Sequence, residues 1–210
     1  MMSVLNKIAH FQNRRDELPN QELARQLAES HDRQGIQEIA ENLWNKEPNV
    51  QADCIKVLYE IGYREPELVA AYADDFVKLL KSRHNRLVWG SMIALSTVAK
   101  FAANELEAHI PEIQKAMERG SVITVDAGVA ALAGIASTND ERRRRIFPYL
   151  LKHLATCRPK DVPQHAEKAL VAVGRENKHA FSEVLEKRLE DMNAAGVKRV
   201  RKVIKDAEKR

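Results

Sequence analysis

Glycine and proline are scarce in this sequence, with 8 and 7 residues in a chain of 210, and aromatic residues make up only 5%. So few turn-forming residues leave little room for a loop-rich fold. Hydrophobic residues reach 44% and charged residues 30%, which is too apolar for a disordered chain. Ala, Leu, Glu, Lys, Arg and Gln dominate, and all of them favour helix. We therefore expect an all-α protein.

The sequence also lacks the motifs of common catalytic and cofactor sites. It has no glycine-rich phosphate loop, and no two of its seven histidines lie three or four residues apart, the helical spacing of many metal ligands. His109 and His153 are expected on the surface. We predict no catalytic residues, no metal site and no small-molecule cofactor.

Targeting signals are missing as well. The first 17 residues lack the apolar core of a secretory signal peptide. The longest weakly charged run, residues 121–139, contains Asp126 and consists mostly of small residues, so it is a poor membrane span. These absences predict a cytoplasmic protein without a membrane span.

What the sequence does contain is a repeat of about 37 residues. Leucine recurs at this spacing, and a β-branched residue recurs three positions later. Pro111 and Pro148 keep the same interval. A fixed period in this range is the signature of a solenoid, in which each helix pair buries its apolar face on its neighbours. The recurring positions are Leu58, Leu95, Leu132 and Leu170, followed by Ile61, Val98, Ile135 and Val173.

We read residues 1–210 as a single α-solenoid domain. Two short helices, over residues 3–17 and 20–30, form an N-terminal cap within 1–33, and a pair over 177–210 closes the array. Cys54 and Cys157 fall about three repeats apart, too far for a disulfide. The four repeats between the caps cover residues 34–62, 66–99, 104–136 and 140–174.

Small residues share one position in successive second helices. Nothing larger than a thiol occurs there, which predicts close approach between helices. Glycine inside a helix costs about 1 kcal/mol relative to alanine, so packing should compensate at Gly128 and Gly134. The four residues at this position are Cys54, Ser91, Gly128 and Ala166.

The repeats resemble those of the HEAT family, relatives of the armadillo solenoids. The first helices carry Ile110-Pro111-Glu112-Ile113 and Phe147-Pro148-Tyr149-Leu150-Leu151, and the second helices end in Ala94-Leu95, Ala131-Leu132 and Ala169-Leu170. The likeness covers about residues 34–175 and implies a right-handed α-α superhelix of about five helix pairs. The family's Asp and Arg turn pair is only approximated, at residues 49–51 and 85–87.

In such arrays the second helices line a concave surface. Helical periodicity then places one ridge opposite the buried stripe. Trp89 is the residue of most interest, because it lies either in the groove, as an anchor for a partner, or in the core between repeats. Trp44 is expected to pack. The predicted partner-binding ridge consists of Lys56, Tyr59, Trp89, Ile93, Asp126 and Lys168, with Ala52, Ala130 and Ala133 among its small members.

Positive charge is concentrated at two places. Residues 198–210 carry seven basic and two acidic residues, so the first 197 residues account for −1 of the total charge of +4. The second place is a four-arginine run at the start of a predicted helix. Each is a solvated surface or a contact for an anionic partner. The candidate contacts are Arg142, Arg143, Arg144 and Arg145, and Lys198, Arg199, Arg201 and Lys202.

The favoured function is a non-catalytic scaffold that binds a protein segment along the ridge, because apolar grooves accept helices or extended peptides. The alternative is a DNA-binding solenoid. Some HEAT-like proteins are alkylpurine DNA glycosylases, and Trp89 and Asp126 suit that likeness, but Ile93 stands where an acid is wanted and no arginine row is present. A third possibility is a subunit of a larger assembly.

Overall fold

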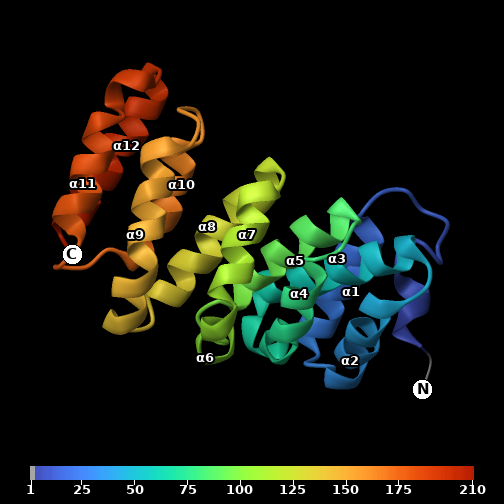
Figure 1. The fold of residues 1–210 in the computed structure, drawn as a ribbon. Coiled ribbons are helices and arrows are strands. Elements are labelled where there is room, and N and C mark those ends of the chain that lie inside the picture. The colour runs from blue at the N-terminus through green and yellow to red at the C-terminus, as the bar shows by residue number, and fades with distance from the viewer. Residues whose placement is uncertain (1–2) are drawn as a thin grey trace. The chain divides into compact units, whose positions relative to one another are not determined.

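A computed structural model describes residues 3–210, and the regular secondary structure over that range is entirely helical, with twelve α-helices and seven 3-10 helices (Figure 1). The chain divides into two compact units, Met1–Gly128 and Val129–Arg210, which we call unit 1 and unit 2. The boundary lies within α8. No helix in residues 3–210 combines the length and apolarity that crossing a bilayer requires.

Unit 1 begins with a short 3-10 turn and continues as a series of helices. Their bounds are η1 Val4–Lys7, α1 Leu18–Glu29, α2 Arg33–Glu41, η2 Asn42–Trp44, α3 Pro48–Arg64, η3 Pro66–Leu68, η4 Ala70–Tyr72, α4 Ala73–Leu79, α5 Asn85–Val98, α6 Ala103–Leu106, η5 Glu107–His109, α7 Ile110–Arg119 and α8 Val122–Ala136.

Helix starts in unit 1 follow local sequence signals. The Asp32 carboxylate accepts a hydrogen bond from the Gly35 N–H and so caps α2. Pro48 opens α3 and Pro111 lies in the first turn of α7, where a missing N–H costs nothing.

Helices α1, α3 and α5 lie side by side in unit 1, with α2 against α3 and α4 against α5. This is the stacking that the 37-residue period predicts. The repeated positions form the core: Leu58, Leu95 and Ile61 are completely buried, as is Val98.

Close approach between α3 and α5 depends on glycine. A Cβ on Gly62 would overlap Thr97 Oγ1 and lie 2.9 Å from Thr97 Cβ.

A Cβ on Gly128 would overlap Met117 Cγ and lie 2.6 Å from its sulfur. The predicted compensation by packing is therefore present at Gly128, and Cys54 and Ser91 at the equivalent position are completely buried.

Unit 2 contains two further helix pairs after the end of α8 (Figure 1). Helix α9 packs against α10 and α11, and α12 packs against α10 and α11, so that each pair stacks on the next. Phe147 and Phe181 meet in its core with ring centroids 6.0 Å apart. The bounds are α9 Asp140–Thr156, α10 Val162–Ala169, η6 Leu170–Ala172, α11 Lys178–Lys187, η7 Leu189–Asp191 and α12 Ala194–Glu208.

The apolar stripe continues into unit 2 with one exception. Leu132 and Ile135 are completely buried and Val173 is 4% exposed, but Leu170 is only half-buried. Helix α10 ends at Ala169 and the 3-10 helix η6 begins at Leu170, so the α-helical spacing no longer holds there.

Two local predictions are wrong. The helix expected over residues 3–17 is reduced to η1, because the N–H groups of Ala9 and His10 donate to side chains of α1 and α3 rather than to helical carbonyls. Trp44, expected to pack, is 51% exposed, and the adjacent Leu43 fills the core instead.

Candidate functional site

Three aromatic side chains of α3 and α5 form what we call the aromatic cluster: Tyr59, Tyr63 and Trp89. The first two lie one helical turn apart, with ring centroids 6.0 Å apart in an edge-to-face arrangement. Trp89 comes from the neighbouring helix, and its ring centroid is 6.4 Å from that of Tyr59. Tyr59 is buried, Trp89 is half-buried and Tyr63 is 62% exposed, so the cluster runs from the core to the surface.

An ionic network supports the buried end of the cluster. Lys56 Nζ lies 2.9 Å from Glu17 Oε2, 2.8 Å from Glu60 Oε1 and 4.8 Å from the centre of the Tyr59 ring. Burial works against the charged form of Lys56, but the hydrogen bonds to Glu60 and Glu17 outweigh it and raise its pKa. The bond from Lys56 in turn lowers the pKa of Glu17, whose second oxygen is 3.2 Å from Arg86 Nη2.

The N-terminal segment covers the side of α3 next to this network. The Asp53 carboxylate accepts hydrogen bonds from the His10 N–H at 2.7 Å and from the Asn20 amide at 2.8 Å. The Asn20 side-chain oxygen accepts from the Ala9 N–H at 2.9 Å. Because helix α1 packs along α3, the first layer of the predicted ridge is closed to solvent.

The expectation of an exposed ridge is therefore wrong for its first members. Lys56 and Tyr59 are 6% and 5% exposed, and Ala52 is 2% exposed. Ala133, in unit 2, is also completely buried. Lys168, likewise in unit 2, is half-buried on α10.

Trp89 lies between the two positions expected for it, the groove and the core between repeats. Its ring contacts Tyr59, yet part of the side chain stays exposed, as do parts of Ile93 and Asp126. Burial and the nearby carboxylates of Glu60 and Asp126 raise the pKa of the Tyr63 hydroxyl. Tyr63 thus stands beside negative charge.

The four-arginine run does not form a single cationic row. Arg143 pairs with Asp140 within α9 and lies against Gly174, and Arg144 Nη1 is 3.5 Å from Glu176. Arg142 donates a hydrogen bond to the Thr138 hydroxyl, and Arg145 also has an interaction partner.

The four candidate contacts on α12 are all exposed, and one of them is paired. Arg199 holds Glu167 with two hydrogen bonds of 2.9 and 2.7 Å. Lys198, Arg201 and Lys202 are exposed. The basic helix therefore keeps a positive outer side.

A shallow hollow of about 450 Å³ in unit 1 lies between the α4–α5 turn and α7. Val88 lines it, but none of the three residues of the aromatic cluster does. Four cationic side chains surround it, with Glu112 as the acidic member: Lys81, Arg83, Lys115 and Arg119.

Side chains that could hold a metal ion gather at one place in residues 3–210. They are His153, Cys157 and His165, all in unit 2. His109 and His153, expected on the surface, are both half-buried.

The sequence pointed to some members of the aromatic cluster and missed others. Tyr63 lies one turn after Tyr59, so helical spacing alone could have added it. Glu17 gave no signal, because its approach to Lys56 depends on how the N-terminal segment folds back over α3.

Comparison with known proteins identifies the fold. No family model matches the chain, and no curated protein matches it. An engineered protein from the Northeast Structural Genomics Consortium is similar at a TM-score of 0.70 and 21% identity, over 99% of this chain and 98% of that one. A designed armadillo repeat protein in complex with a (KR)4 peptide is similar at 0.68 and 19% identity, over 90% and 85%. Computationally designed armadillo repeat proteins for modular peptide recognition are similar at 0.66 and 16%, over 97% and 98%. The chain has an armadillo-like helical-repeat solenoid fold.

Proposed function

We propose that this protein is a non-catalytic repeat scaffold that binds an extended peptide segment at the aromatic cluster of unit 1. The observation that carries the proposal is an aromatic cluster with one end in the core and the other at the surface. Buried Tyr59 fixes the rings, while Tyr63 remains 62% exposed. Rigid aromatic side chains with one accessible face are typical anchors of binding surfaces.

The charge around the cluster favours a basic segment. At the exposed end of the cluster, the carboxylates of Glu60 and Asp126 raise the pKa of the Tyr63 hydroxyl, so this end lies near negative charge. Lysine and arginine side chains bind both carboxylates and aromatic faces. That a designed protein of similar fold was solved with a (KR)4 peptide supports this choice.

Fluorescence of Trp89 tests the proposal. The variant Trp44→Phe leaves Trp89 as the single tryptophan, and its emission is followed while a peptide of alternating Lys and Arg is added. We expect a saturable change that an acidic peptide of equal length does not produce.

Tyr63→Ala should weaken the peptide at least ten-fold, about 1.4 kcal/mol. The matched control is Tyr72→Ala, a half-buried tyrosine on η4 outside the cluster, which should bind as the parent does. Equal affinity in the Tyr63 and Tyr72 variants would remove the cluster from the proposal.

The alternative partner is a nucleic acid, which the four cations around the hollow beside α7 favour. Phosphate binding would weaken steeply with salt, because it releases counterions. Affinity for DNA that falls in this way, and that Tyr63→Ala leaves unchanged, would replace the peptide proposal.

A further inference from the structure

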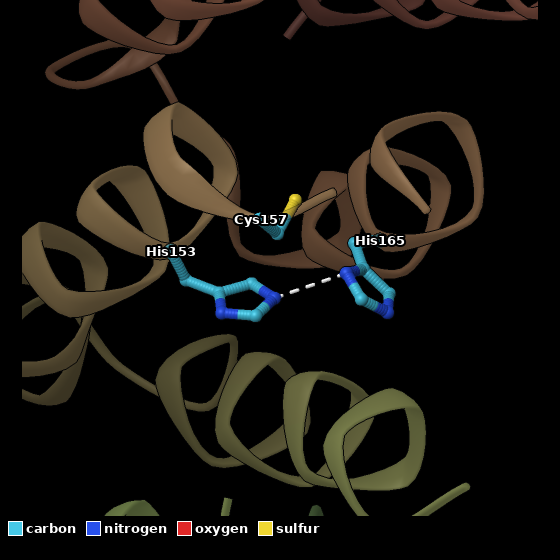
Figure 2. Close-up of side chains that lie close together, drawn as sticks. All are labelled: His153, Cys157 and His165. Carbon is cyan, nitrogen blue, oxygen red and sulfur yellow. Dashed lines mark hydrogen bonds between the residues drawn. The ribbon is translucent and has the colours of Figure 1, made fainter. Parts of the chain in front are cut away.

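Two histidines and a cysteine of unit 2 meet where α9 ends and α10 begins (Figure 2). His153 is in the last turn of α9, Cys157 directly follows that helix, and His165 is in the first turns of α10. His153 Nε2 and His165 Nδ1 are 3.0 Å apart, and one ligand atom from each of the three residues lies within 4.8 Å of the others. His165 is 3% exposed, whereas the other two are half-buried, so the cluster reaches the surface on one side.

The spacing of the ligand atoms is close to that of a tetrahedral zinc site. Zinc–nitrogen bonds of about 2.0–2.1 Å and zinc–sulfur bonds of about 2.3 Å place two nitrogens about 3.3 Å apart and sulfur about 3.6 Å from each. The two imidazole nitrogens, at 3.0 Å, need to separate only slightly. The sulfur lies within 4.8 Å of both nitrogens and donates to the Leu154 carbonyl at 3.8 Å, so it must move closer by no more than about 1.2 Å and give up that hydrogen bond.

The backbone that carries the cysteine is fixed by a buried arginine. Arg188, which follows α11, donates to the carbonyls of Leu154 at 2.6 Å and Cys157 at 2.8 Å, and its Nε is 2.6 Å from Asp191. Its side chain is only 10% exposed. The last turn of α9 is therefore held in place independently of any bound ion, and such preorganisation favours a ligand site.

The protonation state of His153 also suits a metal. Burial and the adjacent His165 lower the pKa of His153 to about 4, so this imidazole is neutral near pH 7 and its lone pair is available. Burial raises the pKa of the Cys157 thiol, although Arg188 works in the opposite direction. The remaining charge nearby is Asp161, which Arg158 Nε approaches to 2.6 Å.

We infer that His153, Cys157 and His165 form a binding site for a divalent zinc-like ion, with the fourth position left to water. Thiolate and imidazole together select zinc over magnesium or calcium, which prefer oxygen ligands. Binding moves the imidazole proton shared by the histidines to a non-ligating nitrogen and releases the thiol proton to solvent. The ion joins the two helices of one repeat, so this site acts on unit 2 and is independent of the peptide surface.

Cobalt(II) serves as the spectroscopic probe. Added to the chelator-treated full-length protein, it should bind at one ion per chain with a thiolate-to-metal charge-transfer band and the intense visible absorption of tetrahedral cobalt. Metal binding to the chelator-treated protein should release about one proton at pH 7, because the thiol is protonated before binding, and zinc should then displace cobalt without further proton release. A protein that binds no cobalt, or binds it without the charge-transfer band, contradicts the inference.

Three variants locate the site. Cys157→Ser should abolish the charge-transfer band, and His153→Gln should weaken cobalt binding at least ten-fold. Cys54→Ala is the matched control, since Cys54 is completely buried outside the cluster, and its band should be unchanged. Melting temperatures measured without metal show whether each variant is folded, and His153→Gln tests the site even if Cys157→Ser does not fold. A band that persists in Cys157→Ser overturns the assignment.

Discussion

The carboxylate of Asp53 is the acceptor that holds the N-terminal segment on unit 1, and its removal should be costly. It is 8% exposed and accepts hydrogen bonds from the His10 N–H and from Asn20, which is completely buried. A hydrogen bond to a charged group contributes about 1.5–3 kcal/mol, and a buried donor left unpaired costs about 1–3 kcal/mol. Part of this is returned, because the mutant no longer buries a carboxylate.

We therefore expect Asp53→Ala to lower the free energy of unfolding by about 3 kcal/mol. For a unit of this size that corresponds to a loss of roughly 10 °C in melting temperature. Asp75→Ala is the control, because Asp75 forms an exposed pair with Lys78 at 3.1 Å, and such pairs contribute about 0–1 kcal/mol. Urea unfolding followed by circular dichroism gives both values.

Two further readouts separate this explanation from a general loss of packing. Amide exchange at Ala9 and His10 should accelerate in Asp53→Ala more than exchange in α5, since these N–H groups belong to the network. In a double-mutant cycle, Asn20→Ala and Asp53→Ala together should cost less than the sum of the two single losses, because the side chains share one bond, although Asn20→Ala also removes the acceptor of the Ala9 N–H. Additive effects, or a change below about 0.5 kcal/mol for Asp53→Ala, would refute the reasoning.

Three other predictions follow from the packing and the titrating groups. Gly62→Ala should destabilise unit 1 by about 1–3 kcal/mol in chemical unfolding, because the Thr97 Cβ cannot rotate away from the added methyl group. This loss should outweigh the better helix propensity of alanine, and a stabilised variant would contradict the prediction. Trp89→Ala should lower the free energy of unfolding by about 2 kcal/mol, because the half-buried Trp89 ring contacts Tyr59, whereas Tyr63→Ala should lower it by less than about 1 kcal/mol. Equal losses of stability in thermal melting would contradict the described exposures. The pKa of His153 is lowered from 6.5 to about 4, so without metal the stability of unit 2 should be complete above pH 6.5 and fall as the pH drops towards 4. His153→Gln should flatten this pH dependence of the free energy of unfolding, and an unchanged pH dependence would assign it to other groups.

The fold was predictable because the repeat period records the packing directly. Leu58, Leu95 and Leu132 are completely buried, as their spacing predicted, since a residue at the same place in each repeat meets the same neighbours. Leu170 departs from the pattern because its helix becomes a 3-10 turn, and helical spacing cannot anticipate that change.

The candidate site was less predictable, for two physical reasons. Lys56 and Tyr59 were expected in a groove, but their burial depends on Glu17 and the N-terminal segment, which approach α3 through contacts about 40 residues away in sequence and follow no repeat. His153 and Cys157 lie four residues apart, a spacing that can bring two metal ligands together on one helical turn. The spacing between histidines alone does not reveal this pair, because one of its members is a cysteine.

The closure of the first layer also bears on where the proposed partner would bind. Helix α1 covers one side of α3 by packing on it. A cap that covered the whole helix would leave no binding surface in that repeat. Instead Lys56 and Glu17 close the network over Tyr59, while Tyr63, one turn further along α3, is 62% exposed. The Lys56–Glu17 ion pair thus fixes the inner rings of the aromatic cluster, so the proposed binding at Tyr63 and the stability of the N-terminal segment should be coupled.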